Sequence, residues 1–147
     1  MSHNPIAPMH YRDRAALEAV VRGFETCTIA PADFSHGLHL TVALWYVAHA
    51  PLAEAITQMR RNLQRFIAHH GVDPQKYNET ITLFWLKFVR HFLDHAGADR
   101  PLPEVANELL ARCGNSQLLF AHYSRELVLT NAAQTDWVEP DLRPLEF

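Results

Sequence analysis

The apolar residues of this chain recur at helical spacing, and no stretch alternates apolar and polar residues as a half-buried strand would. Leu17, Val21 and Phe24 fall on one face of a first helix over residues 13–26, for which Asp13 is the expected N-cap. The pattern therefore predicts an all-α chain. Further helices are expected over residues 31–49, 52–70, 78–93, 103–113 and 117–129.

Short connections separate these segments, so consecutive helices should run antiparallel as an up-and-down bundle. The segment 103–113 is a short additional helix, and residues 131–147 are expected to form an extended C-terminal tail that packs back on the bundle. With 147 residues, the chain has the length of one domain, 1–147. Residues 1–11 and 143–147 are expected to be its flexible ends.

Composition excludes several classes of function. The net charge is −3 and the arginines are scattered, which argues against nucleic acid as a partner. The longest apolar runs are too short to cross a membrane, and the first ten residues lack the pattern of a signal peptide. Cys27 and Cys113 stand alone, as in a reducing cytoplasm. The expected partner is a small molecule, and a homodimer is compatible with the sequence.

Ten histidines point to metal binding or acid–base chemistry. His36 and His39 are three residues apart near the start of one expected helix, so they share a face. Glu79 lies in the first turn of a second helix that should point the same way, which would bring the three side chains to one end of the bundle. His122 is the candidate fourth ligand. This set suits zinc or non-haem iron, and no organic cofactor is predicted.

Each of these residues also has a structural explanation. His36 and His39 can be capping or surface histidines, and Glu79 can complement the positive end of a helix dipole. His122 can be a core histidine whose ring pairs with a backbone carbonyl group. A second pair, His91 and His95, has metal-binding spacing but is explained by a solvated helix end.

Substrate contacts are expected from side chains that adjoin the histidine and glutamate residues in sequence. Arg125 follows His122 by three residues and should share its face, where it could hold a carboxylate or phosphate group. Thr82 should line the same cavity. Asn78 could offer an oxygen atom, although an N-cap is its commoner role. The expected substrate-binding residues are Tyr77, Asn78, Thr82 and Arg125.

Three strings, at residues 34–40, 77–82 and 122–127, followed by Trp137 to Leu142, resemble a family of small uncharacterised bacterial proteins. Its motifs are HxxHL, Y(H/N)ETxT and HYSxEL, and the likeness covers residues 34–142. The family usually has a histidine where this chain has Asn78. The resemblance supports the grouping of His36, His39, Glu79 and His122, and it implies no reaction.

The leading hypothesis is a metal-binding helical bundle with His36, His39 and His122 as ligands and Glu79 as a further ligand or a catalytic general base. Such a site would serve a metal-dependent hydrolase, transferase or oxygenase. The first alternative is a non-catalytic ligand-binding module, in which Glu79 bonds a histidine directly and Arg125 turns inward. The second is an interaction protein whose polar cluster only sets the helix register.

Overall fold

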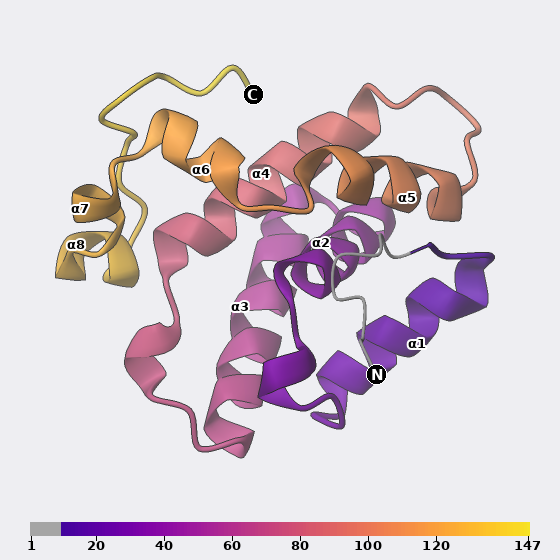
Figure 1. Ribbon diagram of the computed structural model, residues 1–147, viewed down its shortest axis with the longest axis horizontal. Helices are drawn as coiled ribbons and strands as arrows, with labels where there is room; N and C mark the ends of the chain where they lie inside the picture. The colour runs from indigo at the N-terminus through magenta and orange to yellow at the C-terminus, as the bar shows by residue number, and fades with distance from the viewer. Residues whose placement is uncertain (1–9) are drawn as a thin grey trace, which may run out of the picture.

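The computed structural model describes residues 10–147, and the regular structure in that range is entirely helical, which confirms the predicted all-α bundle (Figure 1). Residues 1–9, which include most of one expected flexible end, lie outside the described range. The α-helices are α1 (Arg14–Glu25), α2 (His36–His49), α3 (Leu52–His69), α4 (Glu79–Asp94), α5 (Leu102–Cys113), α6 (Gln117–His122), α7 (Arg125–Val128) and α8 (Asn131–Thr135). Two short 3₁₀ helices are η1 (Pro31–Asp33) and η2 (Pro74–Lys76).

Helix α2 occupies the middle of the bundle and packs against α1, α3, α4 and α5 (Figure 1). It is apolar around most of its circumference, so it can be covered from several sides. Leu40, Leu44 and Val47 are at most 1% exposed. Full burial of an aliphatic side chain of this size stabilises the fold by about 1.5–3 kcal/mol. The core therefore organises itself around α2.

Side-chain caps set where the helices begin. The Asp13 carboxylate accepts a hydrogen bond from the amide of Ala16, and the Ser35 hydroxyl accepts one from the amide of Leu38. Because Ser35 caps α2, the helix begins at His36, and the prediction of one helix from residue 31 was wrong. Pro31 instead opens the separate turn η1. His36 and Glu79 are thus the first residues of α2 and α4.

The expected helix over 117–129 is broken in two. Tyr123 has an extended backbone, with φ −121° and ψ 136°, and separates α6 from α7. Ser124 then caps α7 by accepting a hydrogen bond from the amide of Leu127, and its hydroxyl donates to Asp141. Serine side chains offer the backbone such alternatives to a continuous helix, which explains the break.

The C-terminal segment contains the short helix α8 and then runs back over α4 and α6 (Figure 1). The ring of Phe147 lies 5.6 Å from that of Phe84 and 5.4 Å from that of Phe88, both on α4. At the other end, Tyr11 is buried and its hydroxyl bonds to that of Thr41. Tyr11 and Phe147, from the two ends expected to be flexible, are thus placed against the bundle. Within residues 10–147, no helix is both long and apolar enough to cross a membrane.

Candidate functional site

A cavity of about 20 Å³ lies between α2, α3 and α4, and we call it the histidine pocket. His36 and His39 come from the first turn of α2, and Thr82 comes from the first turn of α4. The starts of these two helices therefore meet here. The remaining lining is apolar and consists of Leu40, Ala43, Met59, Ile81, Trp85 and Leu86.

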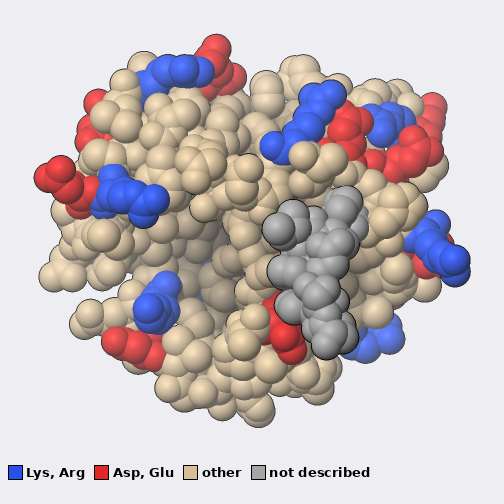
Figure 2. Space-filling model, in the orientation of Figure 1, with Lys and Arg blue, Asp and Glu red and all other residues tan. Residues whose placement is uncertain are grey.

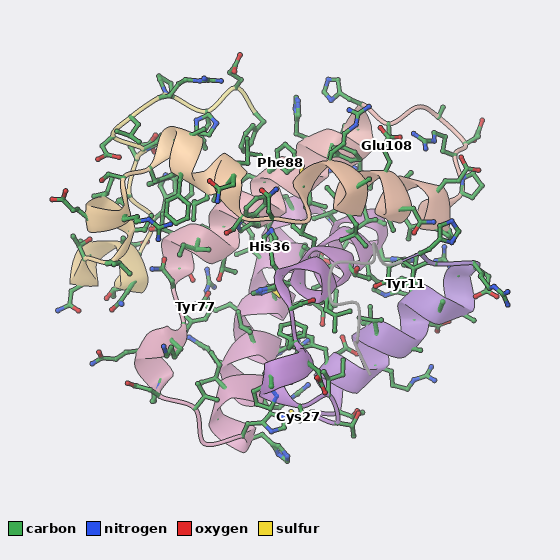
Figure 3. All side chains as sticks on the ribbon, viewed as in Figure 1. Tyr11, Cys27, His36, Tyr77, Phe88 and Glu108 are labelled. Atoms are coloured by element: carbon green, nitrogen blue, oxygen red, sulfur yellow. The ribbon has the colours of Figure 1, made fainter. Side chains whose placement is uncertain are left out.

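His36 is held between aromatic and backbone groups. Its ring meets that of Trp85 edge to face, with the centroids 4.6 Å apart, and the backbone of Cys113 acts on the same ring (Figure 3 labels His36). Burial lowers the pKa of His36, and the backbone of Cys113 opposes that shift only in part. The Nε2 atom of His36 is buried and has no hydrogen-bond partner among residues 10–147. Most buried polar atoms in folded proteins have a hydrogen-bond partner, so a buried nitrogen atom without one is unusual.

His39 lies one turn further along α2 and is half-buried. Its ring centroid is 5.1 Å from that of Phe34. Burial, followed by the nearby charge of His36, lowers the pKa of His39 to about 4. Both imidazoles of the histidine pocket are therefore neutral at pH 7, the form that accepts hydrogen bonds and binds metals.

Glu79 belongs to a separate cluster of strong contacts, which we call the glutamate cluster: Arg60, Tyr77 and Glu79. Its carboxylate accepts two hydrogen bonds from Arg60, at 3.0 Å from Nε and 2.5 Å from Nη2. The Tyr77 hydroxyl donates a third at 2.5 Å. Burial raises the pKa of Glu79, but the bonds from Arg60 and Tyr77 and the charge of Arg60 outweigh it and lower the pKa overall.

These contacts bear directly on the role predicted for Glu79. A general base works best when its pKa lies near the working pH, and the lowered pKa of Glu79 moves it the other way. Its two oxygen atoms already accept strong hydrogen bonds. The geometry thus describes an ion pair that ties α3 to α4. The first alternative in the sequence analysis, a binding module, required a direct bond between Glu79 and a histidine. No such bond is found among the described residues.

His122 is buried near the C-terminal segment and is not among the residues that line the histidine pocket. Its Nδ1 atom lies 3.0 Å from the carbonyl oxygen of Arg143, and its ring stands 5.8 Å from that of Phe84. This matches the alternative of a core histidine paired with a backbone carbonyl group. Across residues 10–147, no three His, Cys, Asp or Glu side chains lie close enough together to hold a metal ion.

The second histidine pair, His91 and His95, brings its rings to 4.2 Å near the end of α4. The Nδ1 atom of His95 lies 2.8 Å from the carbonyl oxygen of His91, which also accepts a hydrogen bond from the backbone amide of His95, the C-cap of α4. The pair therefore has the structural role that the sequence suggested for it.

The four expected substrate contacts have different surroundings. Asn78 is the N-cap of α4 and also donates to the carbonyl oxygen of Val128 at 2.7 Å. Thr82 lines the histidine pocket, and Tyr77 is buried against Glu79. Arg125 was expected to face inward beside His122, and this was wrong: it is exposed, with its guanidinium 4.3 Å from the Phe120 ring centre. The break at Tyr123 places it on another helix.

Sequence reasoning missed Arg60 and Trp85. Arg60 follows the buried Met59 on α3 and reaches Glu79 from the edge of that helix. A buried carboxylate needs a cation, and this requirement was the available signal. Trp85 shares the helix of Thr82 at a spacing of three residues, which places both on one face.

The surface around these clusters carries little charge. Figure 2 shows acidic and basic side chains mostly side by side at the rim of this face, with a hollow left of centre. In the same orientation, that hollow lies between the positions labelled His36 and Tyr77 in Figure 3. Thr82 lines the histidine pocket and lies on the same helix as Glu79, which accepts the hydrogen bond from Tyr77.

No family model, curated protein or solved structure matches this chain.

Proposed function

We propose that this chain is a small-ligand-binding module whose site is the histidine pocket. The observation that carries the proposal is the buried Nε2 atom of His36, which has no hydrogen-bond partner among residues 10–147. Leaving such an atom unpaired costs about 1–3 kcal/mol. A ligand that supplies the missing partner recovers that free energy, so the pocket favours occupation.

The chemistry of His36 indicates which group the ligand presents. The backbone of Cys113 favours a proton on the His36 ring, and we assign that proton to Nδ1, which leaves the partnerless Nε2 atom without one. In a neutral ring protonated at Nδ1, the Nε2 atom is an acceptor. The ligand therefore donates a hydrogen bond, as a hydroxyl group does, and its remainder is apolar and uncharged to suit the lining residues.

The size of the pocket limits how much of the ligand enters. About 20 Å³ accommodates one small group, since a single water molecule needs about 10–15 Å³ measured in this way. A hydroxyl group with its attached carbon fills that space, and the rest of the molecule lies outside the pocket.

Titration with isopropanol and acetone, which have the same heavy-atom skeleton and similar size, tests the proposal. Isopropanol can donate to Nε2 and acetone cannot, so only isopropanol should shift the nitrogen resonance of ¹⁵N-labelled His36 in an NMR titration. His36→Phe keeps an aromatic ring beside Trp85 and should no longer bind isopropanol, as followed by the indole N–H signal of Trp85 in the pocket wall. The exposed His69 provides the control His69→Phe. Equal responses to both solvents, or binding of isopropanol to His36→Phe as strong as to the unmodified chain, would contradict the proposal.

Zinc or ferrous iron is the second candidate ligand, favoured by two neutral imidazoles one helical turn apart. Hydrolase, transferase or oxygenase chemistry would then require a further protein ligand or a base, and Glu79 is occupied by Arg60 and Tyr77. Stoichiometric zinc binding by calorimetry that is lost in both His36→Phe and His39→Phe supports this candidate. Zinc binding retained in both variants counts against it.

We place the protein in the cytoplasm. Both cysteines are free, as expected in a reducing compartment.

A further inference from the structure

A second concave region, which we call the amide groove, lies between the last turns of α3, the turn η2 and α8. Its volume is about 430 Å³, within the usual range for small-molecule sites. Figure 1 shows α8 at the left of the molecule, above the turn that precedes α4. The groove is separate from the histidine pocket, and Tyr77 is in its wall.

Four side-chain amides surround the amide groove: those of Gln64, Gln75, Asn131 and Gln134. None of them makes a side-chain hydrogen bond with another residue in the range 10–147. Each offers one acceptor oxygen and two N–H donors. The groove thus presents a dense set of free donors and acceptors from three separate elements.

The remaining wall is apolar or fixed. Ile67 and Tyr77 are buried, and Pro74 begins the turn beside them. The Tyr77 hydroxyl is held by Glu79, so the ring has a fixed position. Within the described range 10–147, no charged side chain lines the groove. A charged ligand would lose hydration here without gaining a counter-charge, which selects for an uncharged one.

We propose that the amide groove binds an uncharged mono- or disaccharide. Each sugar hydroxyl both donates and accepts, so it can pair with either end of a carboxamide group. The C–H surface of a sugar ring matches the apolar wall of Ile67 and Pro74. An extended peptide fits less well, because its successive amide groups point to opposite sides of the strand and only half of them can face the groove.

The test is an NMR titration of the ¹⁵N-labelled full chain with maltose, glucose and N-acetylglucosamine. At least one of these sugars should shift the side-chain NH₂ signals of the four amides. The double variant Gln64→Leu/Gln134→Leu should weaken its binding at least about tenfold, because two or more hydrogen bonds are lost. The matched control Gln58→Leu/Gln117→Leu alters amides outside the groove and should bind as the unmodified chain does.

Further measurements distinguish an uncharged sugar from a charged sugar, a peptide and a ligand of the histidine pocket. Glucuronic acid should not bind, and His36→Phe should leave the sugar response unchanged because the proposal is independent of the histidine pocket. Gln75→Ser, at an exposed position of η2, offers a test that disturbs no packed side chain and should also weaken binding. The proposal is overturned if none of the three sugars shifts the amide signals, if glucuronic acid binds equally well, or if only a trialanine peptide responds.

Discussion

The glutamate cluster and the histidine pocket both lie at the start of α4, and they differ in whether their polar groups have partners. In the glutamate cluster, the Glu79 carboxylate accepts three hydrogen bonds from Arg60 and Tyr77. In the histidine pocket, Nε2 of His36 is buried with no partner among residues 10–147. The polar groups of the glutamate cluster find their hydrogen-bond partners within the chain, whereas Nε2 of His36 in the histidine pocket does not.

This difference separates structural polar groups from groups that can bind. A satisfied buried network adds rigidity and links the helices that contribute to it. Arg60 and Glu79 connect α3 to α4 in this way. An unsatisfied atom instead weakens the fold and leaves interaction free energy available to a ligand. Under our proposal, the glutamate cluster contributes stability and the histidine pocket contributes binding, and the following predictions test that division.

The largest loss of unfolding free energy among the variants is expected for Glu79→Ala, which leaves Arg60 and Tyr77 without their shared partner. Breaking a fully buried pair costs about 3–5 kcal/mol, and because the Arg60 side chain is 40% exposed we expect about 2 kcal/mol. Urea unfolding measures this loss. Glu18→Ala removes the exposed ion pair with Arg22 and should cost less than about 1 kcal/mol. Equal losses of unfolding free energy in Glu79→Ala and Glu18→Ala would show that the glutamate cluster contributes no more than an exposed ion pair.

Acidification should destabilise the chain through the histidine pocket first. The pKa of His39 is about 4 when folded, below the ordinary 6.5, so the unfolded chain takes up protons first as the pH falls. The free energy of unfolding should decrease by about 2 kcal/mol between pH 7 and pH 4, less than the full pKa shift implies because His39 is half-buried. The lowered pKa of His36 adds in the same direction.

Urea unfolding at a series of pH values measures this dependence, and His39→Phe should flatten it above pH 5. Glu79, whose pKa is lowered below 4.5, loses its stabilising contribution only in more acidic solution. A His39→Phe variant with an unchanged pH profile would show that this histidine is not the source.

A smaller loss is expected for Asn78→Ala. The variant loses the N-cap of α4 and the bond to the Val128 carbonyl oxygen, and an N-cap contributes about 1 kcal/mol. Asn78→Ser keeps a capping hydroxyl and should recover part of the stability. Thermal unfolding compares both with Asn131→Ala, at an exposed position where no side-chain bond is lost. A loss for Asn131→Ala as large as that for Asn78→Ala would argue against the cap.

The smallest effect is expected for His36→Phe. It removes the unpaired Nε2 atom, which favours folding, and the interaction of the ring with the backbone of Cys113, which opposes it. The free energy of unfolding should stay within about 1 kcal/mol of the original value by urea unfolding. A loss as large as that of Glu79→Ala would place His36 among the structural groups.

Local patterns in the sequence were sufficient for most of the fold. Leu17, Val21 and Phe24 are buried on one face of α1, and Asp13 caps that helix as expected. The break between α6 and α7 was not predictable in the same way, because the residues around Tyr123 and Ser124 have an uninterrupted helical pattern. Asp141, seventeen residues further along the chain, supplies the bond that holds Ser124 at the break.

The candidate site was predictable only in part. The spacing of His36 and His39 placed both on one face, and the order of the helices indicated that the start of α4 lies nearby. Which partner Glu79 finds depends on Arg60, a side chain that comes from α3. A pairing between distant residues follows from how the helices pack, and helical periodicity carries no information about it.

The sequence by itself determined the helical class, the helix starts at Asp13 and Asn78, and the presence of histidines at the start of α2, because these depend on spacing and local capping. The tertiary structure decided that Glu79 is an ion-pair partner and that His36 keeps an unpaired buried atom. Both facts depend on burial and on contacts between separate helices, which determine whether a polar group is satisfied within the chain or available to a ligand.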